Sequence, residues 1–138
     1  MRHFNAPSKA LDLLGRILIS ALFVNALPGK LNDFSGTASY IASKGIPSPL
    51  AEFLLVCAIA VLIAGSVLFV FGENTIAGAS LLLIFLVPTT LIFHTFPVDA
   101  GLVRNLAVIG ALILAITRST GAGVPNFRNI RHIRNPFQ

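Results

Sequence analysis

Four ionisable side chains lie near the ends of apolar runs and could do chemistry: Lys30, Asp33, His94 and Arg104. An ionisable group is costly inside a membrane-spanning segment, so each of them is a candidate functional residue. If the apolar runs cross a membrane in alternating directions, all four lie in one layer near its outer side, together with Glu52 and Asp99. Such a layer predicts a polar pocket, open to the outer leaflet, that could bind and protonate the head group of a quinone.

The same polar residues also have a purely structural interpretation, in which ion pairs and snorkelling side chains join the ends of helices. Lys30 and Asp33 are three residues apart, so they can pair with each other on one helix face. Asp12 and Arg16 have the spacing to pair in the same way near the opposite side of the membrane. Asn25, at mid-depth, is expected to form a hydrogen bond across to another helix.

His94 has three interpretations, namely a hydrogen-bonded structural residue, a contact to a quinone or a proton, and an axial ligand of haem or another pigment. A six-coordinate haem needs a second axial ligand, and no other apolar run contains a histidine. The sequence also lacks a phosphate-binding loop, a dinucleotide fingerprint, a zinc-binding helix motif and a nucleophile elbow. It therefore predicts no metal site, no intrinsic cofactor and no enzyme that works on its own.

The elements that position these residues follow from an apolar composition. The chain has 138 residues, of which 55% are hydrophobic and 11% charged, and its mean hydropathy is +0.86. Soluble proteins average about 25% charged residues, so this chain could not cover a globular surface with polar groups. The single cysteine, Cys57, excludes an intrachain disulfide and a cysteine-based cluster. The composition indicates an integral membrane protein.

Four apolar runs are long enough to cross a bilayer: residues 11–31, 50–71, 75–96 and 101–117. A helix of about 20 residues matches a hydrocarbon core of about 30 Å. Residues 32–49 contain several glycines and prolines around Tyr40, and should hold a short amphipathic segment at the interface. Very short connections at 72–74 and 97–100 force antiparallel neighbours. The predicted fold is an all-α, up-down-up-down four-helix transmembrane bundle with a short interfacial segment between helices 1 and 2.

The charge distribution divides the chain into three parts. Residues 1–10 and 118–138 carry the excess of the net charge of +5, and residues 11–117 form the four-span membrane domain. The positive-inside rule places both terminal segments in the cytoplasm. The C-terminal tail is expected to contact anionic lipids or a partner subunit through Arg118, Arg128, Arg131 and Arg134. No nucleic-acid-binding motif accompanies the charge, so nucleic acid is not expected as a partner.

Short motifs follow one another in a fixed order over residues 13–116. Phe-x(6)-Lys-Leu-x-Asp-Phe-x-Gly starts at Phe23, and Tyr-Ile-x(3)-Gly-Ile-Pro-x-Pro starts at Tyr40. A glycine closes the second span, a histidine lies late in the third and an asparagine early in the fourth: these are Gly72, His94 and Asn105. This order resembles the DoxX family of small four-helix membrane proteins. The resemblance implies a role beside membrane redox chemistry, because the name-giving members are subunits of a thiosulfate:quinone oxidoreductase.

The resemblance includes one departure that bears on function. By position, Lys30, Asp33 and His94 match recurrent polar positions of the family, but the glutamate often found in the second span is missing from residues 58–67, which read AIAVLIAGSV. We therefore predict a small accessory or structural subunit of a larger redox or electron-transfer complex, with other membrane subunits as partners. Its expected location is a bacterial inner membrane, either cytoplasmic or photosynthetic. The alternatives are a quinone-interacting oxidoreductase subunit and a carrier of small solutes or lipids.

Overall fold

The computed structural model describes residues 6–96 and 98–121, and every regular element within them is an α-helix. The helices are α1 (Ala6–Asn25), α2 (Leu27–Asn32), α3 (Phe34–Ala42), α4 (Ser48–Phe71), α5 (Thr75–Phe93) and α6 (Ala100–Ser119). Four helical segments of the described chain are long and apolar enough to cross a membrane: Ser8–Asn32, Ser48–Phe71, Thr75–Phe93 and Ala100–Ser119. The predicted all-α membrane fold is confirmed.

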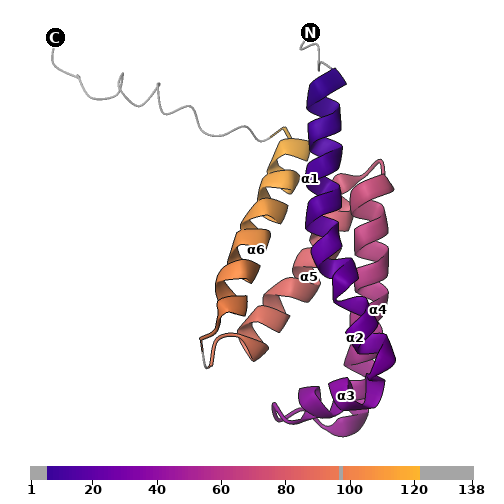
Figure 1. The fold of residues 1–138 in the computed structure, drawn as a ribbon, viewed down its shortest axis with the longest axis vertical. Helices are drawn as coiled ribbons and strands as arrows, with labels where there is room; N and C mark the ends of the chain where they lie inside the picture. Colours follow the sequence, from indigo (N-terminus) through magenta and orange to yellow (C-terminus); the bar gives the residue numbers. More distant parts are fainter. Residues whose placement is uncertain (1–5, 97, 122–138) are drawn as a thin grey trace, which may run out of the picture.

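The spans alternate in direction, as Figure 1 shows. Helices α1 and α2 run one way, α4 returns, α5 runs back and α6 returns again, so that α1 begins and α6 ends at the same end of the molecule. The short helix α3 lies across the opposite end, between the first and the second span. It is the interfacial segment that the sequence predicts, and its position closes one end of the space between the spans.

The first span is broken, which the sequence analysis did not predict for residues 11–31. Helix α1 ends at Asn25 and α2 begins two residues later, because Pro28 has no amide hydrogen and its ring clashes with the carbonyl four residues before it. The Ala26 amide instead donates to the Phe23 carbonyl at 3.1 Å. Asn25 is exposed at this break and makes no side-chain hydrogen bond to another described residue, so the bond expected across to a neighbouring helix is wrong for this part of the chain.

Three helices begin at an Asx residue whose side chain satisfies an otherwise unpaired amide. Asp33, Asn74 and Asp99 precede α3, α5 and α6, and each accepts a hydrogen bond from the backbone N–H three residues later, at 3.0, 3.3 and 3.1 Å respectively. These caps fix where the chain turns between the spans. They also account for two of the acidic residues that the sequence places in the polar layer.

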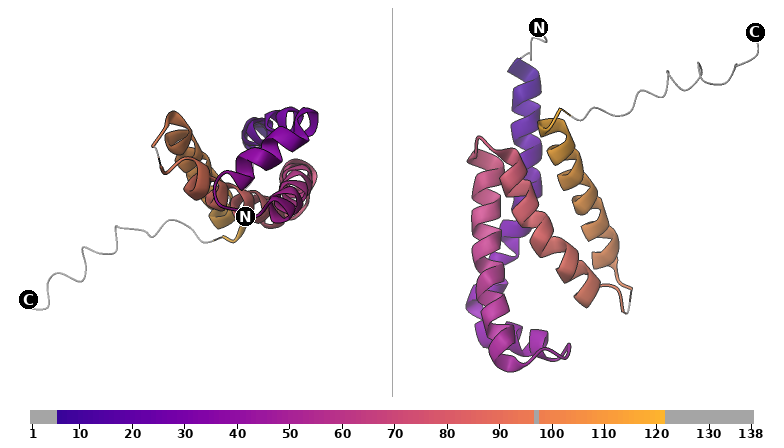
Figure 2. Two further views of the ribbon diagram at one scale, coloured as in Figure 1. Left: turned by 90° about the horizontal axis from the view of Figure 1, so that it is seen from below. Right: turned by 180° about the vertical axis from the view of Figure 1, so that it is seen from behind.

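The core lies where α4, α5 and α6 pack side by side and α1 crosses them. Its fully buried side chains include Leu62 and Phe69 from α4, Leu82 from α5 and Leu112 from α6. Helix α5 contacts α4 on one side and α6 on the other, and Figure 2 shows α5 diverging from α4 away from their shared turn. Near that turn the backbones of α4 and α5 approach closely. A Cβ atom added to Gly78 would lie only 2.6 Å from the Cα atom of Phe69.

Two polar contacts tie the spans together. The first lies beside the turn that α4 and α5 share, and the second lies away from it. Arg16 forms an ion pair with Asp12 at 2.6 Å, as its spacing predicts, and also donates to the Thr75 hydroxyl of α5 at 2.6 Å. Between α5 and α6, the buried amide nitrogen of Asn105 donates to the Thr90 hydroxyl at 3.0 Å, and this hydroxyl donates to a carbonyl of its own helix. Both contacts are made to α5, one from α1 and the other from α6, so they fix the packing of these two helices against it.

Candidate functional site

The candidate site is a cleft of about 460 Å³ enclosed by α2, α3, α4 and α5. It occupies the space that α5 opens by diverging from α4, and α3 covers its end. This volume lies within the range of small-molecule sites in proteins, about 300–1,000 Å³. Most of the lining is apolar, from residues on α3, α4 and α5: Ile41, Leu54, Leu55, Ala58, Val61, Ile84, Phe85, Pro88 and Ile92.

Few polar side chains reach the cleft, and they come from α2, α3 and α5. Lys30 on α2 lines it, as do Thr89 and His94 on and at the end of α5, and Thr37 and Tyr40 on α3. The Lys30 ammonium is half-buried and donates to the carbonyl of Ala26 at 3.4 Å, which leaves donor capacity for a ligand. The Thr89 hydroxyl donates to the carbonyl four residues before it in α5 at 2.7 Å. The cleft is therefore an apolar slot with a cation and an imidazole on its walls.

His94 is hydrogen-bonded to Asp99. Its Nδ1 atom lies 2.9 Å from both carboxylate oxygens of Asp99, which stands in the turn between α5 and α6. This hydrogen bond is the main cause that holds the pKa of the Asp99 carboxyl below its ordinary value. The ring also packs on Gly101, where an added Cβ atom would lie 2.6 Å from Nδ1 and from Cε1. The start of α6 thus fixes both the position and the hydrogen bonding of the imidazole.

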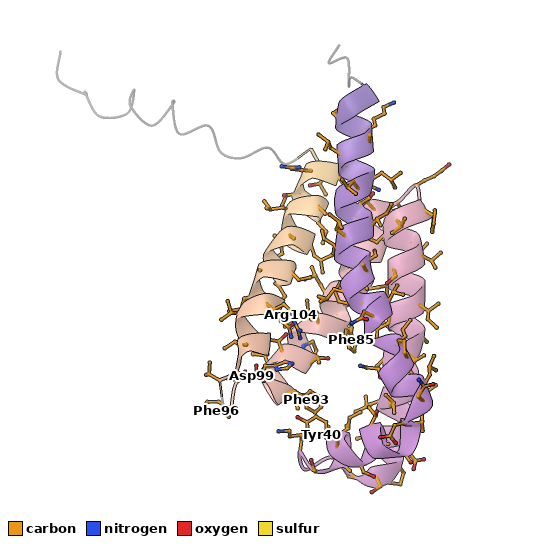
Figure 3. All side chains as sticks on the ribbon, viewed as in Figure 1. Tyr40, Phe85, Phe93, Phe96, Asp99 and Arg104 are labelled. Atoms are coloured by element: carbon orange, nitrogen blue, oxygen red, sulfur yellow. The ribbon has the colours of Figure 1, made fainter. Side chains whose placement is uncertain are left out.

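An aromatic pair stands at the end of the cleft that α3 covers. The rings of Tyr40 on α3 and Phe93 on α5 stack with centroids 5.3 Å apart, and Figure 3 shows them facing each other. The Lys44 ammonium lies over both rings, 5.4 Å from the centroid of Tyr40 and 5.9 Å from that of Phe93. Tyr40 lies in the segment that was expected at the interface, and the structure shows that it also lines the cleft.

The structure does not gather all four of the predicted site residues. Lys30 and His94 line the same cleft, whereas Asp33 caps α3. Arg104 is exposed on α6, after Asp99 in the chain (Figure 3). Lys30 and Asp33 form no ion pair in the described part of the chain, because the capping bond takes the carboxylate away from the lysine. Of the predicted tail contacts, Arg118 is exposed in the last turn of α6, and Arg128, Arg131 and Arg134 lie outside the described residues.

The partner of His94 and the glycine against which its ring packs were not predicted from the sequence. Asp99 was placed in the polar layer but was not recognised as the residue that holds the imidazole. The signal that could have found it is the spacing His-x(4)-Asp-x-Gly across a short turn after an apolar span. Within residues 6–96 and 98–121, no three His, Cys, Asp or Glu side chains form a group that could hold a metal ion.

Four apolar spans, an interfacial helix and a cleft between them define an integral membrane protein of the four-span α-helical class. The sequence model of the DoxX family matches residues 11–95, and the chain belongs to this family. That match contains every residue that lines the cleft, from Lys30 to His94, and ends before α6.

Two relatives come from Escherichia coli strain K12. The chain is 29% identical over 124 residues to inner membrane protein YphA, an alignment that covers 83% of this chain and 87% of the relative. It is 31% identical over 110 residues to inner membrane protein YqjF, which covers 76% of this chain and 82% of the relative. No solved structure matches the chain.

Proposed function

We propose that this protein is an inner-membrane subunit that binds a quinone in the cleft between α2, α3, α4 and α5, beside a larger redox complex. The location is supported by the two relatives, both of which are named inner membrane proteins. The ligand class is supported by one observation above the others, which is the apolar cleft that carries Lys30 and His94 on its walls.

The chemistry of the cleft fits a quinone because a quinone is a flat apolar ring with a polar oxygen at each of two opposite positions. The walls contributed by Phe85, Pro88 and Ile92 suit the ring, and Lys30 and His94 place polar groups where its oxygens, as carbonyl or hydroxyl, could meet them. A ligand with charged groups would find little compensation among such walls. Entry from the lipid would not require the ligand to pass through water, since all the lining helices belong to or adjoin the spans.

The polar contacts, rather than the apolar walls, should decide the affinity. A quinone dissolved in the bilayer already has apolar surroundings, so moving its ring into the cleft gains little hydrophobic free energy. A hydrogen bond to a neutral partner contributes about 0.5–1.5 kcal/mol and one to a charged partner about 1.5–3 kcal/mol. Loss of the contact to the charged Lys30 should therefore weaken binding by about tenfold or more, and loss of a contact to a neutral His94 by about twofold to tenfold.

The test is to extract and quantify the quinone that accompanies the protein purified from its native membrane in mild detergent, and to titrate the protein with a short-chain ubiquinone and with its reduced form. Lys30→Met should weaken binding of both forms and His94→Phe binding of at least one, whereas Arg104→Gln serves as the matched control because Arg104 is exposed and lies outside the cleft. Wild-type protein that carries no quinone and binds none would contradict the proposal, and so would equal losses in all three variants.

A structural subunit without a bound ligand is the second candidate function. It is supported by the family resemblance and by the absence of an acidic residue from residues 58–67. It predicts that the protein co-purifies with larger membrane subunits and that His94→Phe assembles normally and leaves the turnover of the complex unchanged. A carrier of small solutes or lipids would instead reveal itself by uptake into liposomes that contain only the purified protein.

A further inference from the structure

We infer that the cleft selects a ring that presents a hydroxyl group to His94, and therefore holds the reduced form of a quinone in preference to the oxidised form. The inference rests on the proposed function and adds which form of the ligand the site recognises. It also assigns Asp99 as a positioning residue, which acts on the ligand only through His94.

The hydrogen on the imidazole of His94 is placed by Asp99. Nδ1 of His94 is 2.9 Å from both oxygens of Asp99, and an ionised carboxylate can only accept hydrogen bonds. The lowered pKa of Asp99 favours the ionised form. Nδ1 must then carry the hydrogen. In a neutral imidazole with its hydrogen on Nδ1, the second nitrogen, Nε2, is a hydrogen-bond acceptor.

The orientation of the ring leaves Nε2 for the ligand. The edge that carries Nδ1 and Cε1 packs on Gly101 at the start of α6, where an added Cβ atom would lie 2.6 Å from either ring atom. His94 also lines the cleft, so the edge that carries Nε2 and Cδ2 is the one turned away from α6. Nε2 has no hydrogen-bond partner in the described part of the chain.

The two oxygens of a ring in the cleft would therefore meet opposite kinds of group. The Lys30 ammonium only donates, and it suits either a carbonyl or a hydroxyl oxygen. Nε2 of His94 only accepts, and it suits a hydroxyl group but opposes the lone pairs of a carbonyl. A hydroxylated ring satisfies both groups, whereas an oxidised ring leaves Nε2 unpaired.

The experiment compares two stable probes that differ in one hydrogen-bond donor, 4-butylphenol and its methyl ether 4-butylanisole. Their dissociation constants are measured by calorimetry at about pH 8, where a histidine side chain is ordinarily neutral, for the full chain in detergent micelles. His94→Phe keeps a ring of similar shape but has no Nε2. The ratio of constants between wild type and this variant, taken for each probe separately, cancels the partition of the probe into the micelle.

The wild type should bind the phenol about threefold to tenfold more tightly than His94→Phe does, with little difference for the ether. Asp99→Asn keeps a side chain able to cap α6, but its amide can donate to Nδ1 and place the hydrogen on Nε2, so the preference for the phenol should disappear. Arg104→Gln should keep it. Binding of both probes with equal ratios would overturn the inference and leave the proposed function standing. Failure of both probes to bind the folded wild type would overturn both.

Discussion

Replacing Thr90 with valine should weaken the packing of α5 against α6. Valine has the shape of threonine but no hydroxyl group, so the substitution removes the acceptor that lies 3.0 Å from the amide nitrogen of Asn105. Thr90 and Asn105 are only 2% and 4% exposed, so water does not replace the lost partner. The amide of Asn105 is then left buried with one hydrogen bond fewer.

The expected cost follows from the chemistry of that pair. Interhelical hydrogen bonds in membrane proteins contribute about 0.6 kcal/mol on average and up to about 1.7 kcal/mol, and a buried polar group left unpaired costs about 1–3 kcal/mol. We expect Thr90→Val to lower the free energy of unfolding by about 1–2 kcal/mol. Thr89→Val is the matched control, because the Thr89 hydroxyl bonds only to the Phe85 carbonyl of its own helix. Its cost should stay below about 0.5 kcal/mol.

The assay is reversible unfolding in mixed micelles with increasing sodium dodecyl sulfate, followed by the circular dichroism of the helices. A double-mutant cycle with Asn105→Leu should give a coupling energy of about 0.5–1.5 kcal/mol between the two positions. Equal losses for Thr90→Val and Thr89→Val would refute the reasoning. A coupling energy within about 0.3 kcal/mol of zero would refute it as well.

Three further predictions use the same unfolding assay. Gly78→Ala should destabilise the protein by about 1–3 kcal/mol because its Cβ atom meets the backbone of α4, whereas Gly110→Ala, with open space around it, should not. Arg16→Met should cost about 1 kcal/mol through the lost contact to α5, and more than Asp12→Asn, which leaves that contact in place. Asp99 has a pKa below its ordinary 3.8, so it stabilises the fold above that pH and the stabilisation is lost as the pH falls through the lowered value; wild type should exceed Asp99→Asn in stability at neutral pH and converge with it in acid.

The spans and their order could be predicted from the sequence because they depend on local composition. Runs of apolar residues and very short connections determine the antiparallel arrangement without any knowledge of packing. The pair formed by Asp12 and Arg16 was also predictable, since four residues separate them on one helix. The break before Pro28 shows the limit of this reasoning, because hydropathy is continuous across it while the backbone is not.

The cleft could not be predicted, because it depends on how far α5 diverges from α4 and on where α3 comes to lie. Ranking the polar residues by depth placed Lys30, Asp33, His94 and Arg104 in one layer, yet depth says nothing about which face of a helix each occupies. Asp33 is used by a helix cap, and Arg104 lies on an exposed face. The pairing of His94 with Asp99 needed the geometry of the turn between α5 and α6.

The most direct test of a quinone site in this cleft is photolabelling. The full chain in lipid nanodiscs would be irradiated with an azidoquinone, and the modified residues would be located by tandem mass spectrometry. The proposal predicts that the label concentrates on residues lining the cleft, such as Tyr40, Phe85 and Ile92, and that excess unlabelled quinone removes it. A label spread over lipid-facing residues outside the cleft, such as Ile63 and Val103, and insensitive to competition would contradict the proposal.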